Sequence, residues 1–137
     1  MKRVRFLVVA LAALVLAATA GAANPVRATL TTSSTQPLVD TPWRYTIVVK
    51  NRAGKPLAAK ARLQVLAGTL VVGCWKQTAV VHCSGANAGT WITFKGKRSA
   101  VISWPAHTAG MKLAFQATVV AAGKSLQLRA PLTVRLP

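Results

Sequence analysis

Apolar and polar side chains alternate with a period of two residues along much of this chain, and no other feature limits its fold as strongly. The pattern is clearest where Trp43, Tyr45, Ile47 and Val49 alternate with Arg44, Thr46, Val48 and Lys50. Successive side chains of a β-strand point to opposite faces of a sheet, so this alternation predicts a strand with one buried face. From residue 26 onward, no stretch carries the apolar period of about 3.6 residues that marks an amphipathic helix. The sequence therefore predicts an all-β protein.

Short apolar stretches separated by turn residues are the expected strands. They cover residues 26–30, 43–50, 62–72, 74–83 (hairpin-like), 90–94, 99–104, 112–120 and 125–135. Gly68 is expected to mark a bulge or bend, and Pro131 to place the last strand at a sheet edge or a bulge, because proline cannot donate to a ladder. Turn signals about every 8 to 12 residues are typical of a β-sandwich of seven to eight antiparallel strands. A small closed barrel is the alternative architecture.

Two segments resemble a known group of domains. Residues 43–51 (WRYTIVVKN), followed by Gly54-Lys55-Pro56-Leu57, resemble the second strand and turn of bacterial extracellular immunoglobulin-like domains. Residues 104–110 and the strand at 113–119 resemble the late strands of the same group, and fibronectin type III domains share this layout. The resemblance implies an immunoglobulin-like sandwich with an adhesion, binding or spacer role, and it supplies no catalytic residue.

The N-terminus has the order of a secretory signal peptide. A basic start with Lys2, Arg3 and Arg5 precedes an apolar run over 6–18, and small residues follow over 19–23. We therefore expect a helical signal peptide at 1–23 and one immunoglobulin-like domain at 24–137, secreted outside the cell or held at its envelope. An uncleaved membrane anchor is the alternative, although a spanning helix needs about 20 apolar residues. After cleavage, no membrane contact is expected.

Positive charge dominates the predicted mature chain. The whole sequence carries a formal net charge of +17, and removing Lys2, Arg3 and Arg5 leaves +14, with Asp40 as the single carboxylate side chain. So many cations cannot pair internally, and they must lie in solvent or meet an acidic partner. Because they are scattered along the sequence, we expect a basic surface on all sides. Acidic envelope polymers are the expected partners, whereas nucleic acid is not, because no stripe of basic and aromatic residues is present.

The only two cysteines, Cys74 and Cys83, are expected to form a disulfide in an oxidising compartment. A metal site would have to combine them with His82 and His107. His82 and Cys83 are adjacent, so they would point to opposite faces of a strand, and we expect no metal. No cofactor motif is present either.

The sequence contains few of the residues that enzymes use for acid–base or nucleophilic catalysis. Asp40 has no second carboxylate with which to share acid–base work. A serine triad would need Asp40 together with His82 or His107, and the chain contains no Gly-x-Ser-x-Gly elbow. We therefore expect a non-enzymatic protein.

The aromatic residues divide into an expected core and a candidate surface. The expected core residues are Trp43, Tyr45, Phe94, Trp104 and Phe115. The candidate binding surface for a sugar or an anionic polymer consists of Trp75, Lys76, Trp91, Lys95, Lys97 and Arg98. Alternatively, Trp75 packs over the disulfide. A second functional hypothesis is a module at the cell surface that docks a protein partner through an edge strand or through Trp75 and Trp91.

Overall fold

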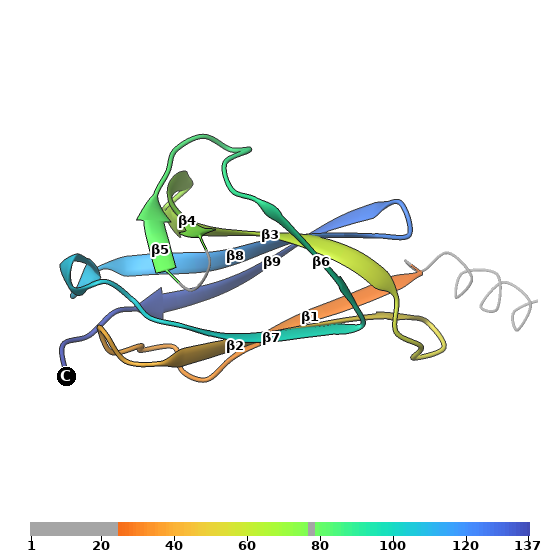
Figure 1. Cartoon of the computed structure of the whole chain (residues 1–137), viewed down its shortest axis with the longest axis horizontal. Helices are drawn as coiled ribbons and strands as arrows, with labels where there is room; N and C mark the ends of the chain where they lie inside the picture. Colours follow the sequence, from red (N-terminus) through yellow and green to blue (C-terminus); the bar gives the residue numbers. More distant parts are fainter. Residues whose placement is uncertain (1–24, 77–78) are drawn as a thin grey trace, which may run out of the picture.

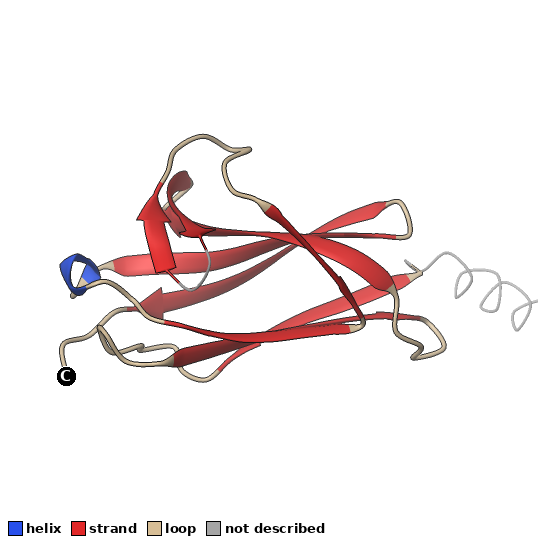
Figure 2. Ribbon diagram, in the orientation of Figure 1, coloured by secondary structure: helices blue, strands red, loops and turns tan. Residues whose placement is uncertain are grey.

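Two antiparallel β-sheets face each other across a shared core (Figures 1 and 2). The computed structural model describes residues 25–76 and 79–137, and nine strands and one short 3-10 helix lie within them. These elements are β1 (Val26–Thr32), β2 (Trp43–Asn51), β3 (Ala58–Ala67), β4 (Leu70–Lys76), β5 (Ala79–His82), β6 (Trp91–Lys95), β7 (Lys97–Ile102), η1 (Ala106–Thr108), β8 (Lys112–Ala121) and β9 (Lys124–Thr133). The prediction of an all-β protein is confirmed.

The two sheets differ in size. The smaller sheet has the order β1-β2-β7, and the larger has the order β5-β4-β3-β8-β9. β6 also belongs to the larger sheet and shares one edge of β3 with β4: β6 pairs with residues 58–62 and β4 with residues 64–67. A tight turn at Gly96 then carries the chain from β6 into β7, and so from the larger sheet to the smaller (Figure 1).

The described residues form nine strands where the sequence predicts seven to eight. The predicted single strand over 62–72 is in fact a hairpin, because Gly68 adopts a φ of 64° in a two-residue turn between β3 and β4. Positive φ costs glycine no steric energy, which suits it to such turns. A bulge does occur nearby: Val65 pairs with Gly73 and Leu66 with Val71, so β4 contains one extra residue. Pro131 lies in β9, at the edge of the larger sheet, as predicted.

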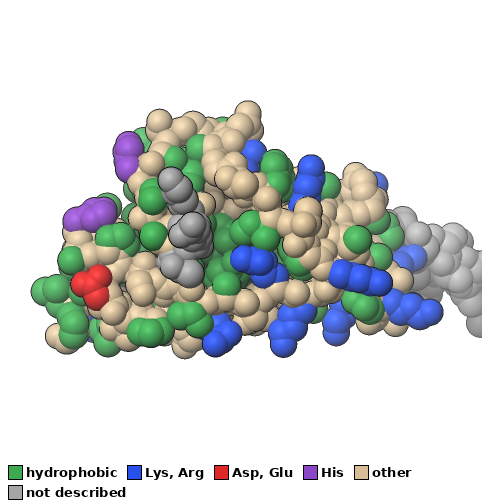
Figure 3. Space-filling model, viewed as in Figure 1, with side chains coloured by type: hydrophobic (Ala, Val, Ile, Leu, Met, Phe, Trp, Pro, Cys, Tyr) green, Lys and Arg blue, Asp and Glu red, His purple; other side chains and the backbone are tan. Residues whose placement is uncertain are grey.

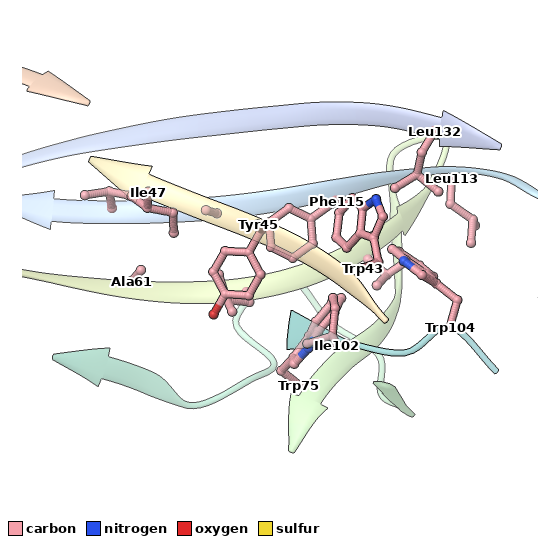
Figure 4. Packing of buried hydrophobic residues seen from close by; sticks show 14 of the residues in the cluster. Trp43, Tyr45, Ile47, Ala61, Trp75, Ile102, Trp104, Leu113, Phe115 and Leu132 are labelled. Carbon is pink, nitrogen blue, oxygen red and sulfur yellow. The ribbon is translucent and has the colours of Figure 1, made fainter. Parts of the chain in front are cut away.

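Five aromatic rings fill the space between the sheets (Figure 4). They come from four parts of the chain, and none is more than 8% exposed: Trp43, Tyr45, Trp75, Trp104 and Phe115. Phe115 lies at the centre of this aromatic cluster, with ring centroids 5.1 Å from Tyr45, 5.1 Å from Trp75 and 5.5 Å from Trp43. Most of these contacts are edge-to-face, which brings the positive edge of one ring to the negative face of another. Phe94, also predicted to be core, is only partly buried against it.

The segment between β1 and β2 connects the two sheets at one end of the molecule. The Val39 N–H donates to the Arg135 carbonyl over 2.9 Å, and the Arg135 N–H donates to the Pro37 carbonyl over 2.8 Å. One residue further on, the Asp40 N–H donates to the Trp104 carbonyl over 2.9 Å. The segment therefore lies between the end of β9 and the continuation of β7, and its backbone groups are paired on both sides.

The signal-peptide prediction for residues 1–23 concerns a part of the chain outside the described residues. Within the described residues, none of the helical structure has the length and apolar character that crossing a bilayer requires.

Replacing Phe115 by alanine tests whether the aromatic cluster holds the sheets together. We expect Phe115→Ala to lower the free energy of unfolding by about 3–5 kcal/mol, because it leaves a cavity among three other rings. Urea denaturation measures the loss. Phe94→Ala is the matched control and should cost clearly less, since Phe94 is only partly buried. Equal losses in the two variants would contradict the central role of Phe115.

Candidate functional site

The sequence analysis placed Trp75 on a candidate binding surface with Trp91, but Trp75 is a core residue. It is 8% exposed and packs edge-to-face on Trp104 and Phe115. The physical reason is the alternation along β4: Cys74 pairs with Gln64 on the outer face, so the next side chain points inward. The ring of Trp75 therefore packs against core rings and not over the disulfide, which was the alternative prediction.

The other candidate residues fall into separate places. Lys95 and Lys97 are exposed and flank the turn at Gly96, whereas Lys76 ends β4. Arg98 is turned toward the core edge, where its Nε donates to the Tyr45 hydroxyl over 3.0 Å. Trp91 lies on the outer face of the larger sheet, where its ring is met by cations that the sequence analysis did not select. The structure therefore does not bring the six candidates together as one site.

Two cations of β3 flank the indole of Trp91. The Lys60 Nζ lies 4.7 Å from the ring centroid and the Arg62 Cζ lies 4.8 Å from it. Trp91 and Arg62 are direct partners in the ladder, so all three side chains belong to one outer face. Each such cation–π contact contributes about 0.5–1 kcal/mol at exposed sites.

The predicted disulfide between Cys74 and Cys83 is confirmed, with the two Cα atoms 5.8 Å apart. Cys74 lies within β4, and Cys83 directly follows β5. The bond therefore fixes the start of the 83–90 loop, which connects β5 to β6, on the outer face of the larger sheet.

Gln64 holds the middle of the 83–90 loop. It is 1% exposed, and its Nε2 donates to the Ala86 carbonyl over 3.0 Å and to the Ala88 carbonyl over 2.6 Å. Arg62 adds longer hydrogen bonds to the carbonyls of Ala86 and Asn87, at 3.4 and 3.3 Å. The loop carbonyls thus receive their donors from side chains of the sheet, so these two side chains keep the loop against the sheet.

Gln116 and Arg129 continue the same row across the sheet. Gln64 pairs with Gln116 in the ladder of β3 and β8, and Gln116 pairs with Arg129 in the ladder of β8 and β9. Gln116 is 5% exposed, and its Oε1 accepts from Arg129 Nε at 3.2 Å and from Nη2 at 2.8 Å. Two N–H groups of the Arg129 guanidinium thus donate to the same oxygen, and they fix the orientation of the Gln116 carboxamide.

A groove of about 580 Å³ lies over this row, and we call it the outer groove. Its floor is polar, one wall is the apolar β3–β4 hairpin, and the other is the start of the 83–90 loop. The lining residues are Gln64, Leu66, Thr69, Leu70, Val71, Val72, His82, Ser84, Gly85, Ala86, Gln116, Gln127 and Arg129. Arg129 is the only lysine or arginine among them, and no carboxylate is among them. The outer groove therefore presents fixed amide groups and one cation to a ligand.

Seven of the fifteen lysines and arginines in the described residues gather at one end of the molecule, and the cations visible in Figure 3 extend from its middle to that end. These seven belong to the start of β1 and to three turns that the ladders bring side by side. We call this region the basic end, and it comprises Arg27, Lys50, Arg52, Lys55, Lys95, Lys97 and Lys124. Asp40, the only acidic residue of the chain, lies at the other end beside Trp104. No carboxylate is thus available to neutralise the basic end.

The opposite end is more apolar and contains both histidines. A pocket of about 320 Å³ is lined there by His82, His107, Trp104 and mainly aliphatic side chains. Asp40 is not among its lining residues, so the triad that the sequence analysis considered does not converge in this pocket. In the described part of the chain, no group of three or more His, Cys, Asp or Glu side chains is placed to hold a metal ion.

The comparisons with known proteins give no family for this two-sheet, disulfide-linked domain. No family model matches the sequence, and no curated protein matches it either. Among solved structures, a DUF4466 family protein from Parabacteroides merdae is similar, with a TM-score of 0.40 and 15% sequence identity. The similarity covers 80% of this chain but 43% of that protein, so this chain spans less than half its length.

The disulfide should stabilise the fold by restricting the unfolded chain. In the chain-entropy model, a loop of about 10 residues corresponds to roughly 2.7 kcal/mol, and we expect a Cys74→Ala/Cys83→Ala double variant to lose about that much. Denaturation with and without a reductant measures it: reduction should destabilise the natural protein and leave the double variant unchanged. A double variant as stable as the natural protein would contradict this role.

Removing the carboxamide of Gln64 should loosen the 83–90 loop. We expect Gln64→Leu to accelerate hydrogen exchange at the Ala88 amide, which donates to the Gly85 carbonyl, by about tenfold or more. Gln127→Leu, at an exposed position of the same groove, serves as the control and should leave that exchange rate unchanged. Unchanged exchange in Gln64→Leu would show that the loop does not depend on these hydrogen bonds.

Proposed function

We propose that this protein is an exported, non-enzymatic module of the immunoglobulin-like class that binds acidic polymers of the cell envelope through its basic end. The observation that carries the proposal is the basic end itself, where seven cations share one end of the molecule and the single carboxylate lies at the other. Charges of one sign concentrated in this way attract an oppositely charged polymer and steer its approach.

The strand order supports the immunoglobulin-like part of the proposal. The small sheet β1-β2-β7 corresponds to strands A, B and E of such domains, and β9-β8-β3 corresponds to G, F and C. β4 and β5 occupy the positions of the extra strands C′ and C″ of variable-type domains. β6, in the position of strand D, pairs with β3 instead of joining the smaller sheet.

The disulfide and the N-terminal sequence support export. Disulfides persist in oxidising compartments and are rare in reducing ones, and this one closes a loop on the protein surface. The basic, apolar and small-residue order of residues 1–23 is the pattern of a cleaved signal. The non-enzymatic part of the proposal rests on the residue inventory and on the place of Asp40 outside the histidine-lined pocket.

Neutralising the basic end should weaken polymer binding more than neutralising the same number of charges elsewhere. The test variant is Lys55→Gln/Lys95→Gln/Lys124→Gln, and the control is Arg44→Gln/Lys112→Gln/Arg135→Gln. All six side chains are exposed. At about 1 kcal/mol for each cation near an anionic surface, the test variant should bind a soluble polyanion about 100-fold less tightly at low salt.

Titration calorimetry with a teichoic acid or a polyuronate gives the affinities. The control variant should lose much less, because its three cations lie away from the basic end. Equal losses would mean that net charge alone drives binding. Strong binding of one protein partner that does not change with salt would instead favour a protein-docking module.

A further inference from the structure

The outer groove contains two polar side-chain atoms that the fold itself leaves without a partner. We propose that this groove is the subsite for one carboxylate-bearing sugar unit of an acidic glycan. The inference rests on the proposed function and deepens it, because it names the kind of polymer that the protein selects.

The orientations of the two glutamines are determined by their partners. The Gln64 amide nitrogen must face the carbonyls of Ala86 and Ala88, because a carbonyl accepts and cannot donate. The Gln116 oxygen must face the Arg129 guanidinium, because a guanidinium only donates. Two atoms therefore remain: the Gln64 Oε1, an acceptor, and the Gln116 Nε2, a donor.

Both remaining atoms keep a small exposure, and both residues belong to the floor of the outer groove. In the described part of the chain, the buried side-chain polar atoms without a partner are Arg62 Nε, Trp75 Nε1 and Trp104 Nε1. Gln64 Oε1 and Gln116 Nε2 have no protein partner there either, yet they are not among these buried atoms, so each retains access to solvent.

This pair of atoms suits the hydroxyl groups of a sugar. Gln64 and Gln116 are direct ladder partners, so their side chains start about 4.5–5.5 Å apart. A hydroxyl both donates and accepts, and neighbouring hydroxyls of one ring can bond the acceptor and the donor together. Because both side chains are at least 95% buried, little rotamer freedom is left for the ligand to remove.

The same groove supplies a cation and an apolar wall. Arg129 is exposed, and its fork of donors still has positions beyond the two that hold Gln116, which suits a carboxylate. Leu66, Val71 and Val72 provide the apolar wall against which the C–H face of a sugar ring can pack. With a volume of about 580 Å³, the groove lies within the usual size of ligand sites.

Neighbouring units of the same glycan would meet further cations. Arg62 lies two residues before Gln64 on the outer face of β3, and Lys60 lies two residues before Arg62. Both cations contact the ring of Trp91. Two residues of a strand span about 6.6 Å, so these cations continue from the groove towards the basic end at regular steps.

The hydrogen bonds within the protein use only one of the two polar atoms of each glutamine carboxamide. The nitrogen of Gln64 donates to the carbonyls of the 83–90 loop, and the oxygen of Gln116 accepts from Arg129. Neither set of hydrogen bonds explains why two nearly buried carboxamides leave their other polar atoms without a protein partner at the floor of one groove beside a guanidinium.

The test is titration of the exported protein with a trigalacturonide, its fully methyl-esterified form and a short polyphosphate, at 0.15 M salt. We expect the trigalacturonide to bind at least tenfold more tightly than its uncharged ester and more tightly than polyphosphate. Nuclear magnetic resonance should show the side-chain amide signals of Gln116 shifting on binding, with those of Gln64 moving less, since its nitrogen faces the loop.

Two conservative variants keep the test specific. Arg129→Lys retains the charge but loses the fork, and it should weaken trigalacturonide binding about tenfold while leaving polyphosphate binding unchanged. Arg135→Lys, an exposed site outside the outer groove, should change neither. If no polyanion binds at all, the proposed function fails together with this inference. If polyanions bind but the uronide has no advantage and Arg129→Lys has no effect, the inference alone is overturned.

Discussion

The contact between the two sheets depends on the ring of Phe115 and the three aromatic side chains that surround it. These four rings come from β2, β4 and β8, and a fifth ring, that of Trp104, joins them from beyond the end of β7. A single cluster thus connects the smaller sheet, the larger sheet and the disulfide-linked hairpin. Since Trp75 belongs to it, the position of β4 and β5, and with it the wall of the outer groove, follows from packing in the core.

The outer face of the larger sheet combines this rigid base with polar chemistry. A disulfide at one end of the 83–90 loop and the Gln64 hydrogen bonds at its middle keep the loop on the sheet. The Arg129–Gln116 contact fixes the neighbouring strands in the same row. A ligand that binds there meets groups that are already ordered, and this lowers the entropic cost of binding.

Alternation and turn residues were enough to predict most of the strands and most of the core, and the two cysteines with an N-terminal signal pattern predicted the disulfide. Trp43, Tyr45, Trp104 and Phe115 are buried because their strands alternate, and that is a local property of the sequence. The hairpin at Gly68 was missed because a glycine inside an apolar stretch is compatible with both a bulge and a turn. The row of Gln64, Gln116 and Arg129 was missed because it depends on the register between β3 and the β8–β9 hairpin, which are distant in sequence. The basic end was missed for the same reason: its turns become neighbours only in the folded protein.

In the proposed function, clustered charge attaches this protein to an acidic envelope polymer. Co-sedimentation of residues 24–137 with purified envelopes across a salt series tests this attachment most directly. The account predicts binding that falls steeply as salt shortens the screening length, about 8 Å at 0.15 M, and that disappears when the anionic polymers are stripped from the envelopes. Binding that is unchanged by salt and by stripping would contradict the account.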